Sequence, residues 1–139
     1  MPEVIFPWRK IQNSNVGNVA RPVALIELRA NTGEWKSFEM RIDSASPITL
    51  LNQSDCEELG YPLKDSKEDK PIQIHSVVLG HWDAHIRKLD MRIGEETISA
   101  RVGFTVGGDH ERLLGRLDVF DNFRITFSGK NLRTSFLRE

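Results

Sequence analysis

Ile42-Asp43-Ser44-Ala45-Ser46-Pro47 carries the strongest functional signal in the sequence. The stretch places a carboxylate and two hydroxyl groups directly after an apolar residue. A charged group at the end of a buried strand is costly unless hydrogen bonds compensate it. Asp43 therefore lies either in a turn, where Ser44 and Ser46 satisfy it, or in a polar site that serves a function. Because Asp and Ser are common turn formers, these six residues alone favour the turn.

Alternation of apolar and polar residues surrounds this stretch and predicts a mainly β chain. Residues 23–28 form an apolar run that is typical of a buried strand, and residues 38–42 alternate with period two. The turn residues Asn31-Thr32-Gly33 separate them, so we expect a hairpin. The same alternation predicts a second hairpin over residues 89–104 and a last strand over residues 123–127.

Two short helices interrupt the predicted strands. Ser54 and Glu57 fit a capping box at the start of the first helix, and Gly60 fits the position just after its end. Leu117 and Phe120 have the i, i+3 spacing of a brief second helix. Short strands with tight turns in a small chain favour a closed or sandwich-like β architecture.

Composition narrows the possible functions. The 139 residues suit one domain, and 19 basic against 20 acidic side chains leave a net charge of -1. This balance predicts neither nucleic acid nor an anionic membrane as a partner. Cys56 is the single cysteine, so no disulfide can form within the chain. We find no signal-peptide pattern and no apolar run long enough to span a membrane, and therefore expect a cytoplasmic location.

The order of several short motifs resembles the retropepsin-like aspartic proteases, the single-lobe family that includes retroviral proteases and bacterial relatives. That family has a strand ending in Asp-Thr/Ser-Gly, which corresponds to Ile42-Asp43-Ser44-Ala45. Its later apolar-apolar-Gly segment corresponds to Leu113-Leu114-Gly115-Arg116. Between them the family places a flap hairpin, for which Val78-Leu79-Gly80-His81-Trp82 is the candidate. The resemblance covers residues 23–128 in the right order, which favours a catalytic role for Asp43 over an ordinary turn.

The resemblance implies an all-β, retropepsin-like closed β-barrel with a flap hairpin and one or two short helices. Residues 20–139 would form the protease domain and residues 1–19 an N-terminal arm. In this family two aspartates hold one water, and two carboxylates about 3 Å apart share a proton. One serves as general base toward the water and the other as general acid toward the carbonyl oxygen. Since the chain has one such motif, the implied enzyme is a homodimer with Asp43 from each protomer and a peptide or protein substrate.

The resemblance also assigns supporting roles around Asp43. Ser44 would hydrogen-bond across the dimer, and the flap would close over an extended peptide and exclude water. Neither a metal nor another cofactor is implied. The chain ends, near Ile5 and residues 132–137, are candidates either for an interface sheet or for frayed termini. The expected site is therefore catalytic Asp43, supporting Ser44, Ala45, Leu114, Gly115 and Arg116, and flap residues Val78, Leu79, Gly80, His81 and Trp82.

Two positions depart from the family pattern. Ala45 stands where the family usually has glycine, and a methyl group there would crowd the carboxylates or oppose a positive φ, although a negative φ would accommodate it. Ser46-Pro47 replaces an acidic residue that pairs with the arginine of the Gly-Arg segment in retroviral members. Arg116 therefore needs Asp118, a carbonyl group or solvent as its partner.

These departures keep a second function open, that of a catalytically degenerate dimerisation or peptide-binding module with the same fold. A third hypothesis is a metal-dependent β enzyme that uses His81, Asp83 and His85, although the sequence contains no HExxH motif. Cys56 is expected to pack as a small apolar residue.

Overall fold

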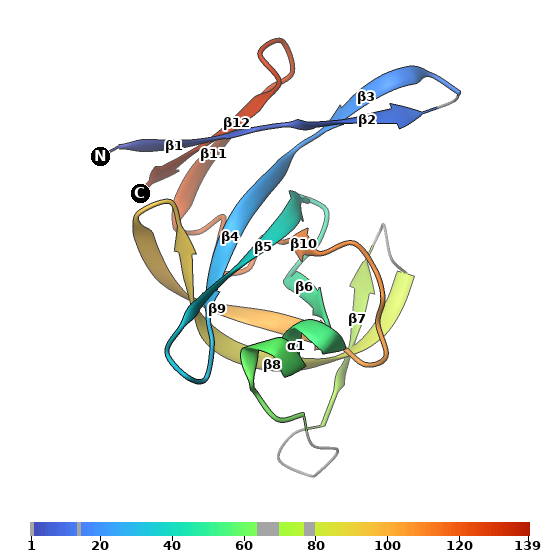
Figure 1. Cartoon of the computed structure of the whole chain (residues 1–139), viewed down its shortest axis with the longest axis vertical. Coiled ribbons are helices and arrows are strands. Elements are labelled where there is room, and N and C mark those ends of the chain that lie inside the picture. Colours follow the sequence, from blue (N-terminus) through green and yellow to red (C-terminus); the bar gives the residue numbers. More distant parts are fainter. Residues whose placement is uncertain (1, 14, 64–69, 77–79) are drawn as a thin grey trace.

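The computed structural model describes residues 2–13, 15–63, 70–76 and 80–139. Within these residues the chain is built from strands and one short helix, α1 (Figure 1). The elements are β1 (Glu3–Pro7), β2 (Arg9–Asn13), β3 (Gly17–Arg21), β4 (Val23–Arg29), β5 (Trp35–Ile42), β6 (Thr49–Asn52), α1 (Gln53–Leu59), β7 (Ile72–Ser76), β8 (Gly80–Ile93), β9 (Glu96–Thr105), β10 (Leu113–Leu114), β11 (Phe123–Ser128) and β12 (Arg133–Arg138).

The largest sheet has seven strands in the order β4-β5-β10-β6-β9-β8-β7. Strand β4 also pairs with β8 through Glu27↔Arg92 and Leu28↔Met91, so most of these strands form a hydrogen-bonded ring. The predicted all-β class is confirmed. The sheet closes on itself through these two residue pairs and not along a continuous barrel seam.

The β4–β5 hairpin forms where the alternation predicts it. Phe38, Met40 and Ile42 of β5 are buried, whereas Glu39 is exposed and Arg41 partly exposed. The predicted second hairpin is the long β8–β9 pair, and the predicted last strand is β11. The apolar faces of these strands enclose one core, whose fully buried side chains include Ile26, Leu28, Met40, Leu51, Leu59, Met91, Ile93, Phe104, Leu114 and Phe136.

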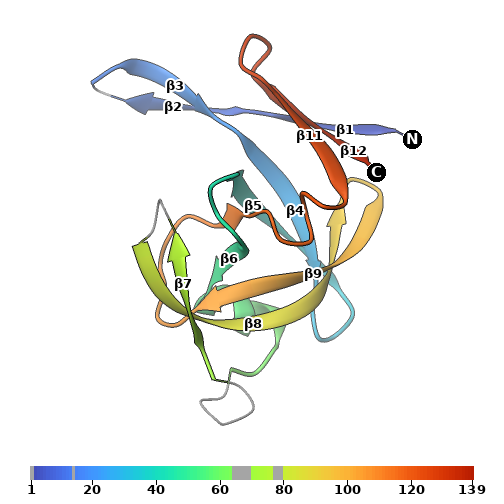
Figure 2. The same cartoon turned by 180° about the vertical axis from the view of Figure 1, so that it is seen from behind.

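The two ends of the chain meet in a separate three-stranded sheet with the order β1-β12-β11. Glu3 pairs with Leu137 and Pro7 with Arg133, so the ends are paired strands and not frayed tails (Figure 2). The Phe6 and Phe123 rings contact the Phe136 ring edge to face within this sheet. Phe123 and Phe136 are also members of the buried core cluster, which attaches the sheet to the core. Strands β2 and β3 form a hairpin that projects from the body. The division into residues 1–19 and 20–139 stays a prediction.

Helix α1 begins earlier than its predicted cap. The N-cap is Asn52, whose backbone N–H donates to the Asp55 carboxylate at 2.9 Å, so the Ser54–Glu57 capping box is wrong. Gly60 follows the helix in the left-handed conformation (φ 80°), as predicted. No helix in the described part of the chain is long and apolar enough to cross a membrane.

The second predicted helix is also wrong. Residues 116–122 form consecutive turns, with Val119 N–H and Phe120 N–H both donating to the Arg116 carbonyl. Asp118 has a positive φ of 66°, which interrupts a right-handed helix. Its carboxylate accepts hydrogen bonds from the Arg101 guanidinium and backbone N–H, and the Arg101 guanidinium keeps the pKa of Asp118 below its ordinary value.

Candidate active site

Asp43 follows the last residue of β5 at the centre of the large sheet. The short strand β10 lies between β5, to which it is parallel, and β6, to which it is antiparallel. Leu114 of β10 pairs with Ile42, and its carbonyl accepts the Asp43 N–H at 3.0 Å. This pairing holds two segments side by side that are about 70 residues apart in the sequence. They are the end of β5 and the segment Leu113-Leu114-Gly115. The structure thus brings together Asp43, Leu114 and Gly115.

The two oxygens of the Asp43 carboxylate have different surroundings. Oδ1 accepts the Ala45 N–H at 3.0 Å. Oδ2 is buried and has no hydrogen-bond partner among the described residues, and the whole residue is only 9% exposed. The alternative that placed Asp43 in a turn agrees with the Ser46 N–H, which donates to the Asp43 carbonyl at 3.2 Å. The Ser46 hydroxyl does not satisfy the carboxylate as that alternative expected, because it donates to the Ile48 carbonyl at 2.7 Å. A buried carboxylate oxygen without a partner in a native fold calls for a physical explanation.

Gly115 is the point of closest approach between the two segments. Its N–H donates to the Thr49 hydroxyl at 3.1 Å, and a Cβ at this position would lie 2.9 Å from the Ile48 Cα and overlap the Ile48 carbonyl group. Glycine is therefore required here by space. The next N–H groups, of Arg116 and Leu117, donate to the Ser46 and Pro47 carbonyls and complete the junction.

The remaining supporting residues, Ser44, Ala45 and Arg116, are exposed at this junction. The Arg116 guanidinium donates to the Ser44 carbonyl at 2.7 Å, so it takes a carbonyl partner and not Asp118. Ser44 and Ala45 are exposed, and the Ser44 hydroxyl makes no hydrogen bond within the described residues. Ala45 does not have a positive φ, so its methyl group creates no backbone strain.

A hairpin occupies the predicted flap position. Strand β7 pairs with the start of β8, with Ile74 opposite Trp82 and His75 opposite His81. Gly80 has a positive φ of 81° at the beginning of β8. The Trp82 ring lies 5.5 Å from the His110 ring, measured between centroids, so this hairpin contacts the loop that leads into β10. Val78 and Leu79 lie outside the described residues.

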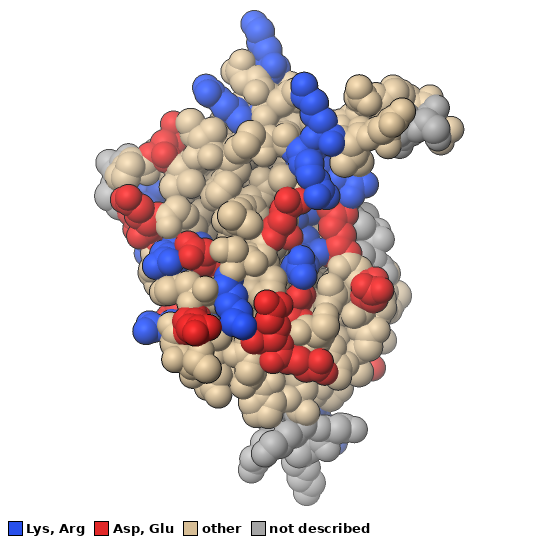
Figure 3. Space-filling view, in the orientation of Figure 1, with Lys and Arg blue, Asp and Glu red and all other residues tan. Residues whose placement is uncertain are grey.

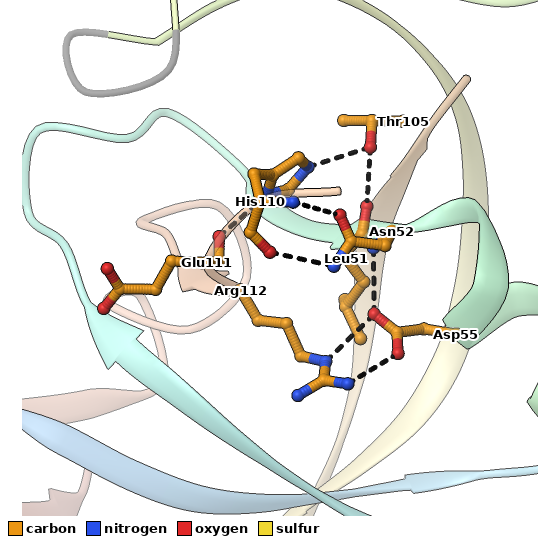
Figure 4. A network of polar contacts seen from close by, with 7 residues as sticks. All are labelled: Leu51, Asn52, Asp55, Thr105, His110, Glu111 and Arg112. Carbon is orange, nitrogen blue, oxygen red and sulfur yellow. Dashed lines mark hydrogen bonds and ion pairs between the residues drawn. The ribbon is translucent and has the colours of Figure 1, made fainter. Parts of the chain in front are cut away.

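A polar network joins the loop 107–112 to the start of α1, and the sequence did not predict it (Figure 4). The Asn52 side chain both donates to the His110 carbonyl and accepts its N–H, each at 2.9 Å. The His110 ring contacts the Thr105 hydroxyl at 2.8 Å and the Glu111 carbonyl at 2.7 Å. Asp55, which is buried, accepts two hydrogen bonds from Arg112 at 2.9 and 3.0 Å, and this contact raises the pKa of the Arg112 guanidinium. The network holds α1 and the loop 107–112 together.

Breaking the Asp55–Arg112 pair is expected to destabilise the protein. Asp55→Ala would leave a partly buried guanidinium without its carboxylate and the Asn52 N–H without its acceptor, at a cost of about 2–3 kcal/mol. Urea unfolding monitored by tryptophan fluorescence measures the change. Glu39→Ala breaks the exposed Arg9–Glu39 pair as a matched control and is expected to cost less than about 1 kcal/mol. Equal losses in the two variants would contradict the structural role given to the buried pair.

The other candidates from the sequence are not gathered into a site. Among the residues that the structure describes, no three His, Cys, Asp or Glu side chains are placed to hold a metal ion. The His81 ring packs on the His75 ring, while His85 is buried. Cys56 is buried in the core cluster and packs there as a small residue, as predicted.

Comparison with known proteins identifies the architecture. No family model matches the chain, and no curated protein matches it. Among solved structures, a retropepsin-like aspartic protease from Rickettsia conorii superposes with a TM-score of 0.61 at 18% identity, covering 97% of this chain and 89% of that one. The chain has a retropepsin-like fold.

A second retropepsin-like structure supports the same conclusion. EIAV protease in complex with the inhibitor HBY-793 superposes with a TM-score of 0.53 at 13% identity, covering 76% of this chain and 88% of that one. The first solved structure is described as a retropepsin-like aspartic protease and the second as a protease, which agrees with the motif order in the sequence. In this retropepsin-like fold, Asp43 and Gly115 come from the two segments that meet at the β5–β10 junction.

Proposed function

We propose that the protein is an aspartic endopeptidase that works as a homodimer, with Asp43 from each protomer. The unpartnered Asp43 Oδ2 carries this proposal. A second Asp43 across a two-fold axis, with a water between them, would supply the missing partner, and the two carboxylates would share one proton. The ionised carboxylate takes a proton from the water as it attacks the peptide carbonyl carbon, and the protonated carboxyl group donates to the carbonyl oxygen.

Two further observations support this proposal. The Ser44 hydroxyl is exposed beside Asp43 and makes no hydrogen bond within the described residues, so it is available to a partner protomer. The hairpin β7–β8 is in contact with the loop 107–112 through Trp82 and His110, so it is in position to cover an extended peptide. The proposed site therefore comprises Asp43, supporting Ser44, Ala45, Leu114, Gly115 and Arg116, and the flap residues 78–82.

Ala45 supports a second candidate function, a peptide-binding or dimerisation module without catalysis. Ala45 is exposed and its N–H donates to the Asp43 carboxylate, so a methyl group at this position could crowd the water and the second carboxylate. In that case a peptide binds, but the reacting groups do not reach each other.

One experiment separates the two functions. The purified protein and Ala45→Gly are incubated with a mixed peptide library from acidic to neutral pH, and products are detected by mass spectrometry. We expect cleavage by the unmodified protein and an increase of less than about tenfold in Ala45→Gly, because the Ala45 backbone is unstrained. Cleavage by Ala45→Gly alone would instead assign the unmodified chain to the non-catalytic module.

A further inference from the structure

Arg41 lies two residues before Asp43 on β5. The core-facing residues of this strand are Phe38, Met40 and Ile42, so Glu39 and Arg41 point to the opposite face. Asp43 comes at the next alternate position, directly after β5, and its N–H extends the pairing with β10 by one step. Two residues along a strand are separated by about 7 Å, which an arginine side chain can span. The Arg41 guanidinium is therefore within reach of a peptide side chain next to the bond held over Asp43.

The cleft beside Arg41 is charged. It has a volume of about 390 Å³, and its lining combines the apolar Val23 with basic and acidic side chains, namely Arg9, Arg41, Arg112, Glu39, Asp109 and Glu111. Figure 3 shows acidic and basic side chains next to each other in the middle of the face that it draws. A pocket of this composition suits a polar or charged side chain better than an apolar one.

Among the described residues, the basic side chains of the cleft differ in how closely they are paired. Arg112 is bound to Asp55 through two hydrogen bonds, and Arg9 pairs with Glu39 at 2.9 Å. Glu111 already accepts from Arg21 at 2.7 Å.

Arg41 reaches Glu111 only at 3.8 Å, which is beyond hydrogen-bond distance, although its side chain is just 31% exposed. Its guanidinium makes no hydrogen bond within the described residues, so a partly buried, permanently charged donor group is left for a ligand.

We propose that Arg41 selects peptides with an acidic side chain at the position adjacent to the scissile bond. This inference rests on the proposed function, because it places the peptide over Asp43. A carboxylate on the Arg41 guanidinium forms charge-assisted hydrogen bonds that an amide or an alkyl group cannot replace. In a two-fold symmetric dimer the second Arg41 lies at the equivalent position on the other side of the bond.

The test uses octapeptides that differ by Glu, Gln, Lys or Leu at one position at a time. Binding is measured by fluorescence polarisation on Asp43→Asn protein, which retains the cleft, and cleavage is measured on the unmodified protein. At one position next to the cleaved bond we expect Glu to bind about tenfold more tightly than Gln or Leu. Arg41→Gln removes this preference, and Arg41→Glu reverses it in favour of Lys. Lys130→Glu, an exposed residue in the turn between β11 and β12, makes the same change in net charge and leaves the preference intact.

The outcomes distinguish the two proposals. Peptides that bind or are cleaved equally well with Glu and Leu at every position, or a Glu preference that survives Arg41→Glu, would overturn the role of Arg41 and leave the protease assignment standing. Failure to bind and to cleave any peptide, with protein that unfolds cooperatively, would overturn the peptide site and the Arg41 proposal together.

Discussion

Asp43→Asn is expected to lower peptide hydrolysis by about 10³-fold or more without destabilising the fold. Asparagine has the same shape, and its amide oxygen can still accept the Ala45 N–H. The amide nitrogen replaces an oxygen that has no hydrogen-bond partner in the described residues, so no intrachain hydrogen bond is lost. The melting temperature should therefore stay within a few degrees of the wild-type value, and the loss of hydrolysis reflects chemistry alone.

Asp121→Asn is the matched control, because Asp121 is an exposed carboxylate outside the site. Its hydrolysis rate should equal that of the unmodified protein. Undiminished hydrolysis by Asp43→Asn would remove Asp43 from the reaction and with it the proposed dyad.

The same variant tests the two-chain site. If each active centre needs Asp43 from both protomers, a ninefold excess of Asp43→Asn chains should lower the hydrolysis by a fixed amount of wild-type protein about tenfold, once subunits have exchanged. The reason is that a wild-type chain then meets a wild-type partner in about one encounter in ten. A site complete within one chain would be unaffected by the excess.

Gly115→Ala is expected to cost about 3 kcal/mol of unfolding free energy, and hydrolysis should be lost with it. The added Cβ would overlap the Ile48 carbonyl group, which is backbone and cannot rotate away as a side chain could. Relief requires that the segment 113–117 move away from the loop 43–48, which breaks the contacts of Gly115 with Thr49 and of Arg116 with Ser46. Denaturant unfolding and the hydrolysis assay together measure the effect.

Gly129→Ala provides the comparison for a glycine without close neighbours. No atom lies within 4 Å of a Cβ at that position, and its backbone is not left-handed. We expect its stability to change by less than about 0.5 kcal/mol. Unfolding of both alanine variants at the same denaturant concentration would contradict the role of Gly115 in holding the segment 113–117 against the loop 43–48.

The strand positions could be predicted from the sequence because a strand with one buried face alternates apolar and polar residues with a period of two. The hairpins β4–β5 and β8–β9 and the strand β11 fit that rule. The elements that sequence reasoning misplaced depend on short-range geometry. Strand β6 runs directly into α1, so the cap falls on Asn52, and the positive φ of Asp118 converts an apparent helix into turns.

The candidate site was predictable only in part for a related physical reason. Asp43 and Gly115 lie within short motifs that need particular residues, so both positions could be predicted from their neighbours in the sequence. The environment of the Asp43 carboxylate depends on a backbone N–H two residues later, and the Asp43 N–H is bound by the distant Leu114 carbonyl. Likewise, the hydrogen-bonded residues Asn52 and His110 are 58 residues apart in the sequence. Whether the Arg41 guanidinium can bind a ligand depends on how the charged residues around it are paired, and no local sequence pattern predicts that.

The pairing of β1 with β12 has a mechanical consequence. Glu3 sits opposite Leu137, so the two ends of this sheet leave the molecule side by side. A force that pulls these ends apart acts along the hydrogen bonds of an antiparallel pair and loads them one after another, as in unzipping. The terminal sheet would therefore peel from its outer end inward at low force.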